Sequence, residues 1–372
     1  MDRQMRWRAP LIWEFMHVDG LQFLKAISDH HGARPAFPYL RCLTLDVASD
    51  LTLRYWKVFA SPYLSSVLDN SGSLGATGPP VCATLFLTHI WSRATPIKEI
   101  SFTRSVTVGS GGFFILSRYD HLKKLRASIV MTNSEVICDN VLSVTELPEG
   151  FCELEDLSLD ISTVGMPDQF NDRMVPGMIM RHVSSSPLKR LVLNWKGCSP
   201  TQDGLRELLA SVARFHETLE TFELRILPRM ELADDETIAL SAILPPLLQL
   251  AKVLRVLDLS ELPLEVDHNS FAALVDACTD LRILRLGQDH SCTTSTVSLT
   301  AITRVRARSL RMEELGLPIA PLTTAGTLAT YLPGEPHSVL RGFDVGHNDD
   351  FDSRDDAWEF VYACFPHAEI RG

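Results

Sequence analysis

The sequence lacks any apolar run long enough to cross a membrane, and it lacks the cysteine spacings of disulfide or zinc frameworks. Its most apolar stretch, residues 239–254, is interrupted by Pro245, Pro246 and Lys252, whereas a spanning helix needs about 18 apolar residues. The stretch Leu11–Met16 is too short for a signal peptide. The eight cysteines include no CxxC pair, which indicates thiols of a reducing compartment. These patterns predict a cytoplasmic or nuclear protein that does not bind membranes.

Positive charge is also scarce. The chain has 35 Lys and Arg residues against 46 Asp and Glu residues, a formal net charge of -11. A nucleic-acid-binding protein needs a clustered basic face to neutralise phosphates. Nucleic acid is therefore not an expected partner.

Signatures of catalysis and of cofactor binding are missing as well. No GxSxG nucleophile motif occurs, and the cluster Gly109–Gly112 lacks the Lys-Ser/Thr of a phosphate-binding loop, so it predicts a turn between a strand and a helix. The acidic segment 344–352, which contains His347, does not match an EF-hand and is interpreted as a surface loop. We predict no catalytic residue, no metal ligand and no cofactor. An enzyme with a site on loops between structural units is the less favoured alternative.

What the sequence does contain is a repeat of the form LxxLxL, with apolar residues at positions one, four and six. Successive copies are about 30 residues apart. The residues at position four are Leu43, Val67, Ile100, Leu125, Leu157, Leu191, Phe222, Leu257, Leu284, Leu315 and Phe343. The second copy is irregular, with Asp69 at position six, and Phe365, Ala368 and Ile370 are predicted to form a final half-unit.

The spacing of the repeat predicts a strand followed by a returning helix. In a strand, positions four and six point to one side and positions three, five and seven to the other. Helical spacing of apolar residues follows in segments 203–215, 271–278, 299–305 and 357–364, with Asn269 or Ser270 predicted to cap the second. The expected fold is an α/β leucine-rich-repeat solenoid of about eleven strand-helix units, with a parallel sheet on its concave face. An ordinary two-domain α/β protein is the alternative.

Three segments carry a resemblance to a known family. They are Phe37–Leu45, Phe271–Leu286 and Val345–Pro366. In these segments the chain resembles the F-box/leucine-rich-repeat proteins of mushroom-type fungi. The resemblance implies a ubiquitin-ligase receptor whose repeats recognise the substrate and whose F-box docks the cullin-ligase adaptor.

The N-terminal segment departs from that family. Residues 1–36 show no recognisable F-box pattern and are predicted to be a capping segment, with the leucine-rich-repeat domain spanning residues 37–372. Adaptor binding is therefore expected only if an F-box lies outside this sequence. A stand-alone or truncated repeat protein without a ligase role is the alternative.

The binding face is predicted from the strand pleat. Polar residues at positions three, five and seven would face solvent on the concave side, with acidic and basic residues interleaved. Such a surface suits a protein partner. The residues predicted to bind it are Asp156, Asp160, Arg190, Asn194, Glu223, Arg225, Asp258 and Arg285. The alternative is that they are ordinary solvated strand residues. The sequence thus predicts a protein-protein interaction scaffold, the substrate-recognition repeat region of an F-box-type receptor.

Overall fold

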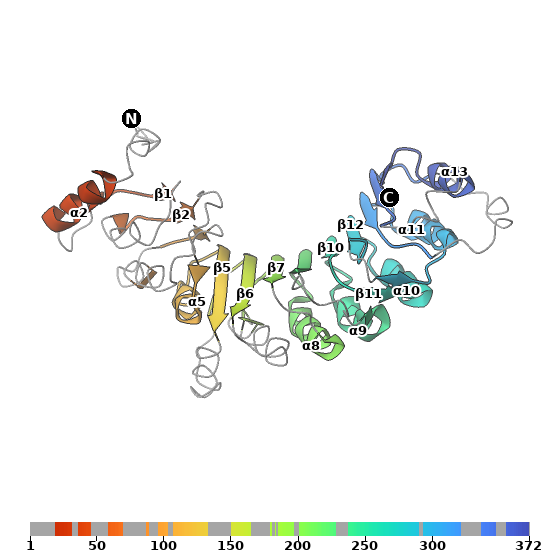
Figure 1. Cartoon of the computed structure of the whole chain (residues 1–372), viewed down its shortest axis with the longest axis horizontal. Helices are drawn as coiled ribbons and strands as arrows, with labels where there is room; N and C mark the ends of the chain where they lie inside the picture. The colour runs from red at the N-terminus through yellow and green to blue at the C-terminus, as the bar shows by residue number, and fades with distance from the viewer. Residues whose placement is uncertain are drawn as a thin grey trace. The chain divides into compact units, whose positions relative to one another are not determined.

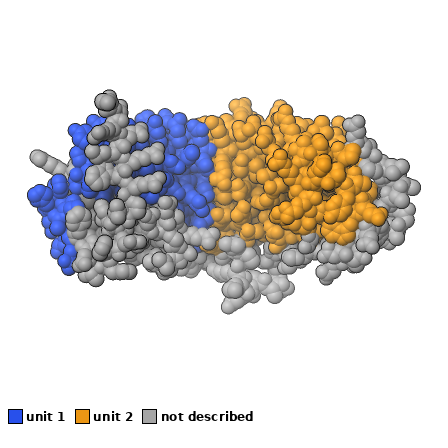
Figure 2. Space-filling view, turned by 90° about the horizontal axis from the view of Figure 1, so that it is seen from above, with its two compact units in different colours: residues 1–164, 182–186 blue, residues 165–181, 187–372 orange. Residues whose placement is uncertain are grey.

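The computed structural model divides into two compact units. Unit 1 comprises residues 1–164 and 182–186, and unit 2 comprises residues 165–181 and 187–372 (Figure 2). The residues whose structure is described are 19–31, 36–45, 59–69, 87–88, 96–102, 107–132, 150–164, 179–180, 183, 185–196, 201–227, 237–289, 293–320, 336–346 and 355–371. The predicted single repeat domain over residues 37–372 stays a prediction.

The strands of unit 1 pair in parallel and in chain order. They are β1 (Cys42–Leu45), β2 (Ser66–Asp69), β3 (Glu99–Ser101), β5 (Lys124–Thr132) and β6 (Asp156–Val164), and β4 (Thr107–Val108) pairs with β5. The described helices of this unit are α2 (Asp19–His31) and α5 (Ser110–Ser117). The glycine cluster at residues 109–112 lies where a turn was predicted, but it begins α5, with Gly109 in the N-cap position.

The strands of unit 2 also pair in parallel and in chain order. They are β7 (Arg190–Lys196), β8 (Thr221–Leu227), β10 (Val256–Leu259), β12 (Ile283–Leu286), β14 (Glu314–Gly316), β15 (Gly342–Asp344) and β16 (Glu369–Arg371). A second small parallel sheet, β13-β11-β9, joins Thr294–Ser295, Leu264–Val266 and Ile238–Ala239. The repeat pattern did not predict this second sheet.

Helices alternate with the strands of unit 2. They are α8 (Gln202–Val212), α9 (Leu240–Leu250), α10 (His268–Ala277), α11 (Ile302–Arg308) and α13 (Asp355–Cys364), with short 3-10 helices η2 (Ala213–Phe215) and η3 (Leu299–Ala301). Figure 1 shows α8, α9, α10 and α11 following one another on the same side of the strands. The chain is thus an α/β protein with parallel strands and interleaved helices.

The core forms where the repeated leucines stack. Leu43, Val67, Ile100, Leu125 and Leu157 are partners in the register of unit 1, and Leu191, Phe222, Leu257, Leu284, Leu315 and Phe343 are partners in unit 2. All of these side chains are buried. Since one short strand cannot bury its own leucines, stacking of neighbouring strands supplies the missing contacts. The predicted alignment of position four is confirmed.

Two local predictions were wrong. The register pairs Phe343 with Ile370, which the repeat had placed at position six, so the last strand is displaced by two residues from the predicted half-unit. Helix α10 is capped by Asp267, whose Oδ1 accepts a hydrogen bond of 2.9 Å from the backbone N–H of Ser270. Asn269 and Ser270 lie inside the first turn of α10. Asp267 precedes both residues, and its side chain makes the hydrogen bond that defines the N-cap.

None of the described helices is long and apolar enough to cross a membrane.

Candidate functional site

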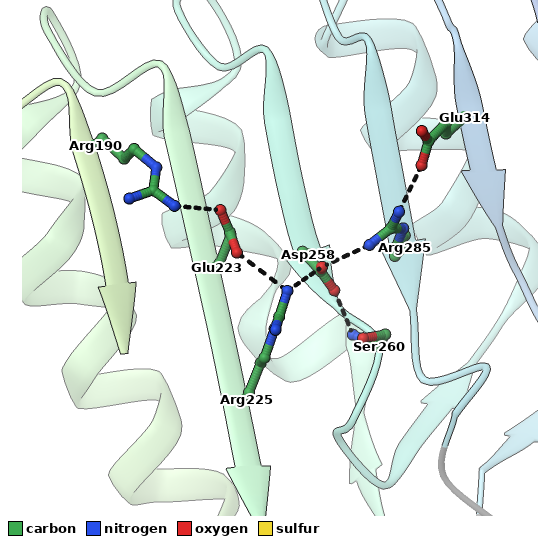
Figure 3. A network of polar contacts seen from close by, with 7 residues as sticks. All are labelled: Arg190, Glu223, Arg225, Asp258, Ser260, Arg285 and Glu314. Carbon is green, nitrogen blue, oxygen red and sulfur yellow. Dashed lines mark hydrogen bonds and ion pairs between the residues drawn. The ribbon is translucent and has the colours of Figure 1, made fainter. Parts of the chain in front are cut away.

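Parallel pairing brings polar side chains from several strands of unit 2 into one row. Glu223 on β8 is the register partner of Asp258 on β10, which in turn is the partner of Arg285 on β12. Two more side chains, Arg225 and Arg190, come from β8 and β7. Figure 3 shows these side chains in front of the strands, with the helices behind. The row therefore lies on the sheet face opposite the leucine core.

These side chains form a continuous chain of ion pairs, which we name the arginine ladder: Arg190, Glu223, Arg225, Asp258, Arg285 and Glu314. Arg190 Nη2 donates to Glu223 Oε1 over 3.1 Å, and Arg225 Nη2 donates to Glu223 Oε2 over 3.3 Å. Arg225 Nη2 also lies 3.6 Å from Asp258 Oδ2, and Arg285 Nη1 donates to the same oxygen over 3.1 Å. Arg285 Nη2 donates to Glu314, which ends the ladder (Figure 3).

Asp258 is the most buried member of the ladder. Its side chain is only 3% exposed, because the guanidiniums of Arg225 and Arg285 lie against it. Its second oxygen, Oδ1, accepts a hydrogen bond of 3.1 Å from the backbone N–H of Ser260. Asp258 was predicted to face solvent, and this prediction was wrong. The pleat did place it on the predicted face, but the longer arginine side chains of the neighbouring strands cover it.

The electrostatics of the ladder favour charged side chains. Burial lowers the pKa of the Arg285 guanidinium, but its hydrogen bond to Glu314 and the charge of Asp258 outweigh burial, so this pKa is raised. Arg285 therefore stays protonated. Since each arginine contacts at least one carboxylate, the ladder balances three positive charges with three negative ones.

Unit 2 contains several buried polar atoms without a hydrogen-bond partner in the described part of the chain. Among the described residues, such atoms include Arg225 Nε, Trp195 Nε1, Glu261 Oε2 and Gln288 Oε1. The last three share position eight of their repeats, one residue beyond the polar face predicted from the pleat. Gln288 extends over the next strand, because a Cβ added to Gly316 would lie 2.6 Å from its amide carbon. Glu261 and Gln288 follow the ends of β10 and β12, where strand alternation no longer applies, whereas Trp195 lies inside β7 and is buried.

Burial and neighbouring charges together raise the pKa of Glu261. Desolvation raises its pKa, Arg225 opposes the rise, and the negative charges of Asp258 and Asp289 add to it. A carboxyl group whose pKa is raised by folding holds its proton more tightly in the folded state. Ionised Glu261 therefore lowers stability as the pH rises from the ordinary glutamate range through the raised pKa.

Removing this carboxylate is expected to stabilise the protein. In Glu261→Gln the midpoint of urea unfolding should rise at neutral pH, and the gain should shrink towards about pH 4, where the carboxyl is protonated in both states. Glu265→Gln, at an exposed position of β11, is the matched control and should change little at either pH. An equal or lower midpoint for Glu261→Gln at neutral pH would contradict this explanation.

The other predicted binding residues are distributed over both units. Asn194 lies on β7 as the register partner of Arg225, beside the ladder. Asp156 and Asp160 lie on β6 in unit 1, half-buried, as register partners of Lys124 and Ser128 on β5. Thus Arg190, Glu223, Arg225, Asp258 and Arg285 are brought together, and Glu314, expected on the same face, completes the ladder. The part of the acidic segment from residue 347 to 352 lies outside the described residues.

Further pairs of opposite charges lie at position two of the repeats, outside the positions predicted to form the binding face. Lys123 pairs with Glu155 at 3.5 Å, Arg255 with Glu220 at 2.9 Å and Arg282 with Glu313 at 3.6 Å. All six side chains are 35–51% exposed. Exposed pairs of this kind contribute about 0–1 kcal/mol each. The more shielded arginine ladder is therefore the stronger candidate for a binding site.

No model of a known protein family matches the chain, and no curated protein is significantly similar to it. The resemblance based on the repeats therefore stays a prediction.

Proposed function

We propose that this chain is a leucine-rich-repeat scaffold that binds another protein through the face that carries the arginine ladder, and that it does not act as an enzyme. The observation that carries the proposal is the ladder itself. Charged side chains from β7, β8, β10, β12 and β14 are fixed by one another on a face that the core does not use. A partner that lies across the strands can contact several of them at once.

The regular alignment of position four supports the repeat class of this scaffold. Stacked units place equivalent residues side by side, which is how solenoid proteins build extended recognition surfaces. Together with the resemblance carried by residues 37–45 and 271–286, this favours the substrate-recognition part of an F-box-type ubiquitin-ligase receptor. In that role the ladder face would hold the substrate.

Partner capture with matched variants tests the proposal. In Arg190→Gln/Arg225→Gln, two guanidiniums are removed while Asp258 keeps its contacts to Arg285 and to Ser260. The wild-type chain, immobilised and exposed to a lysate of cells that express it, should retain a specific partner. The double variant should bind it about 30-fold more weakly, since each of the two lost contacts at an interface is worth about 1 kcal/mol.

The control removes the same charge from the helix side of the same unit. Arg206 on α8 and Arg214 on η2 are both exposed, so Arg206→Gln/Arg214→Gln should capture the partner as the wild type does. Circular dichroism establishes that both variants are folded. Undiminished capture by the ladder variant, with loss in the helix variant, would move the binding site to the opposite face.

A further inference from the structure

We infer that the arginine ladder binds an extended acidic segment of a partner protein, whose carboxylates contact the outer sides of Arg190, Arg225 and Arg285. This inference rests on the proposed function, because it names the chemistry of the partner at that face. It follows from the depth, orientation and spacing of the charges.

The accessible layer of the ladder is basic although its total charge is balanced. The side chains of Arg190, Arg225 and Arg285 are 42%, 40% and 35% exposed. Between them, the carboxylates of Glu223 and Asp258 are only 15% and 3% exposed. A partner at the centre of the ladder therefore meets guanidinium groups first. Glu314, 41% exposed, marks the end of this basic layer at β14.

The carboxylates beneath hold the guanidiniums in place. Arg285 donates to Asp258 and to Glu314, and Arg225 contacts both Glu223 and Asp258. A guanidinium has five N–H donors, so both arginines keep donors for a further acceptor. The Nε atom of Arg225 is buried, so a partner carboxylate would contact the Nη atoms of this side chain. Because these side chains are already fixed, binding loses less conformational entropy than with free arginines.

The spacing of the strands fits an extended peptide. Arg225 and Arg285 lie on β8 and β12, which are separated by β10. Two inter-strand spacings of about 4.8 Å place them about 10 Å apart across the sheet. An extended chain in the polyproline II conformation rises about 3.1 Å per residue with three residues per turn, so carboxylates three residues apart lie on one side of it, about 9 Å apart, which is close to this distance. Arginine is well suited to them, because its fork of donors complements the two oxygens of a carboxylate.

Phosphates would share part of this chemistry, but the chain as a whole opposes nucleic acid. Its formal net charge of -11 repels a polyanion at long range. A short acidic segment that contacts only the ladder is repelled less, because salt screens charges beyond about 10 Å. A protein segment is therefore the favoured partner.

Peptide binding to the full chain tests the inference. Three fluorescent peptides of equal length carry glutamate, glutamine or lysine at every third position in a glycine-serine background, and fluorescence anisotropy measures their dissociation constants. The glutamate peptide should bind about tenfold more tightly than the glutamine peptide, an advantage that added salt reduces. Arg190→Gln and Arg225→Gln should each weaken it about fivefold, and Arg206→Gln on α8 should not.

Several results would overturn the inference. Equal binding of the glutamate and glutamine peptides, tighter binding of the lysine peptide, an equal effect of Arg206→Gln, or tighter binding of a single-stranded oligonucleotide would each do so. If a captured partner depends on the ladder but the glutamate peptide does not bind, only the acidic chemistry is wrong. If capture does not depend on the ladder, the proposed function fails at this face.

Discussion

Truncation of Leu257 to alanine should lower the free energy of unfolding by about 2–5 kcal/mol, the range for a buried leucine that leaves a cavity. Leu257 is fully buried and lies between its register partners Phe222 and Leu284. Because strands on both sides are fixed by their own neighbours, the site has little freedom to collapse. Urea denaturation followed by circular dichroism measures the change.

The matched control for Leu257→Ala is a leucine outside the core. Leu310 is 67% exposed, so Leu310→Ala should change the unfolding free energy by less than about 0.5 kcal/mol. Leu284→Ala, which empties the next layer, should resemble Leu257→Ala. A loss below about 1 kcal/mol for both core variants would show that the leucine layers are not the main source of stability.

Removal of the Asp258 carboxylate should be the second strongly destabilising change. Asp258→Ala deletes the acceptor of Arg225, of Arg285 and of the Ser260 N–H. Breaking one side of a buried ion pair costs about 3–5 kcal/mol. Since both guanidiniums are partly exposed and can be hydrated, we expect a loss of about 2–4 kcal/mol in the free energy of unfolding.

An acid at the exposed end of the same ladder serves as the control. Glu314 also pairs with Arg285, but its side chain is 41% exposed. Glu314→Gln should therefore cost less than about 1 kcal/mol. If Asp258→Ala and Glu314→Gln have the same effect in urea denaturation, burial of Asp258 does not set the strength of its contacts.

The apolar layers could be predicted from the sequence because one rule determines them. Each strand alternates its side chains, so leucines that occupy the same positions of each LxxLxL copy align when the strands stack in parallel, although the copies are separated by unequal lengths of chain. This is why Phe222, Leu257 and Leu284 are register partners, as the repeat predicts. The rule failed at Ile370, because the chain between Phe365 and β16 is two residues longer than in the predicted half-unit and the register moves with it.

The contacts of the ladder could be predicted only in part. Alternation places Glu223, Asp258 and Arg285 on one face, but it does not determine which guanidinium reaches which carboxylate. That choice depends on side-chain length, since Arg225 on β8 reaches Asp258 on the neighbouring strand β10 and shields it from water. Neither Glu261 nor Gln288 could be found, because both follow the strands, where backbone turns and not the pleat decide the direction of a side chain.

Pairing in chain order also affects how unit 2 can fold. The hydrogen bonds of the ladder that join two strands link residues 27, 29 and 33 positions apart, never residues from distant parts of the unit. Each added strand therefore closes a loop of similar length onto a strand that is already in place, at a similar entropic cost. Folding can begin at any neighbouring pair and grow in both directions, so the kinetics depend on the most stable pair rather than on the ends of the chain.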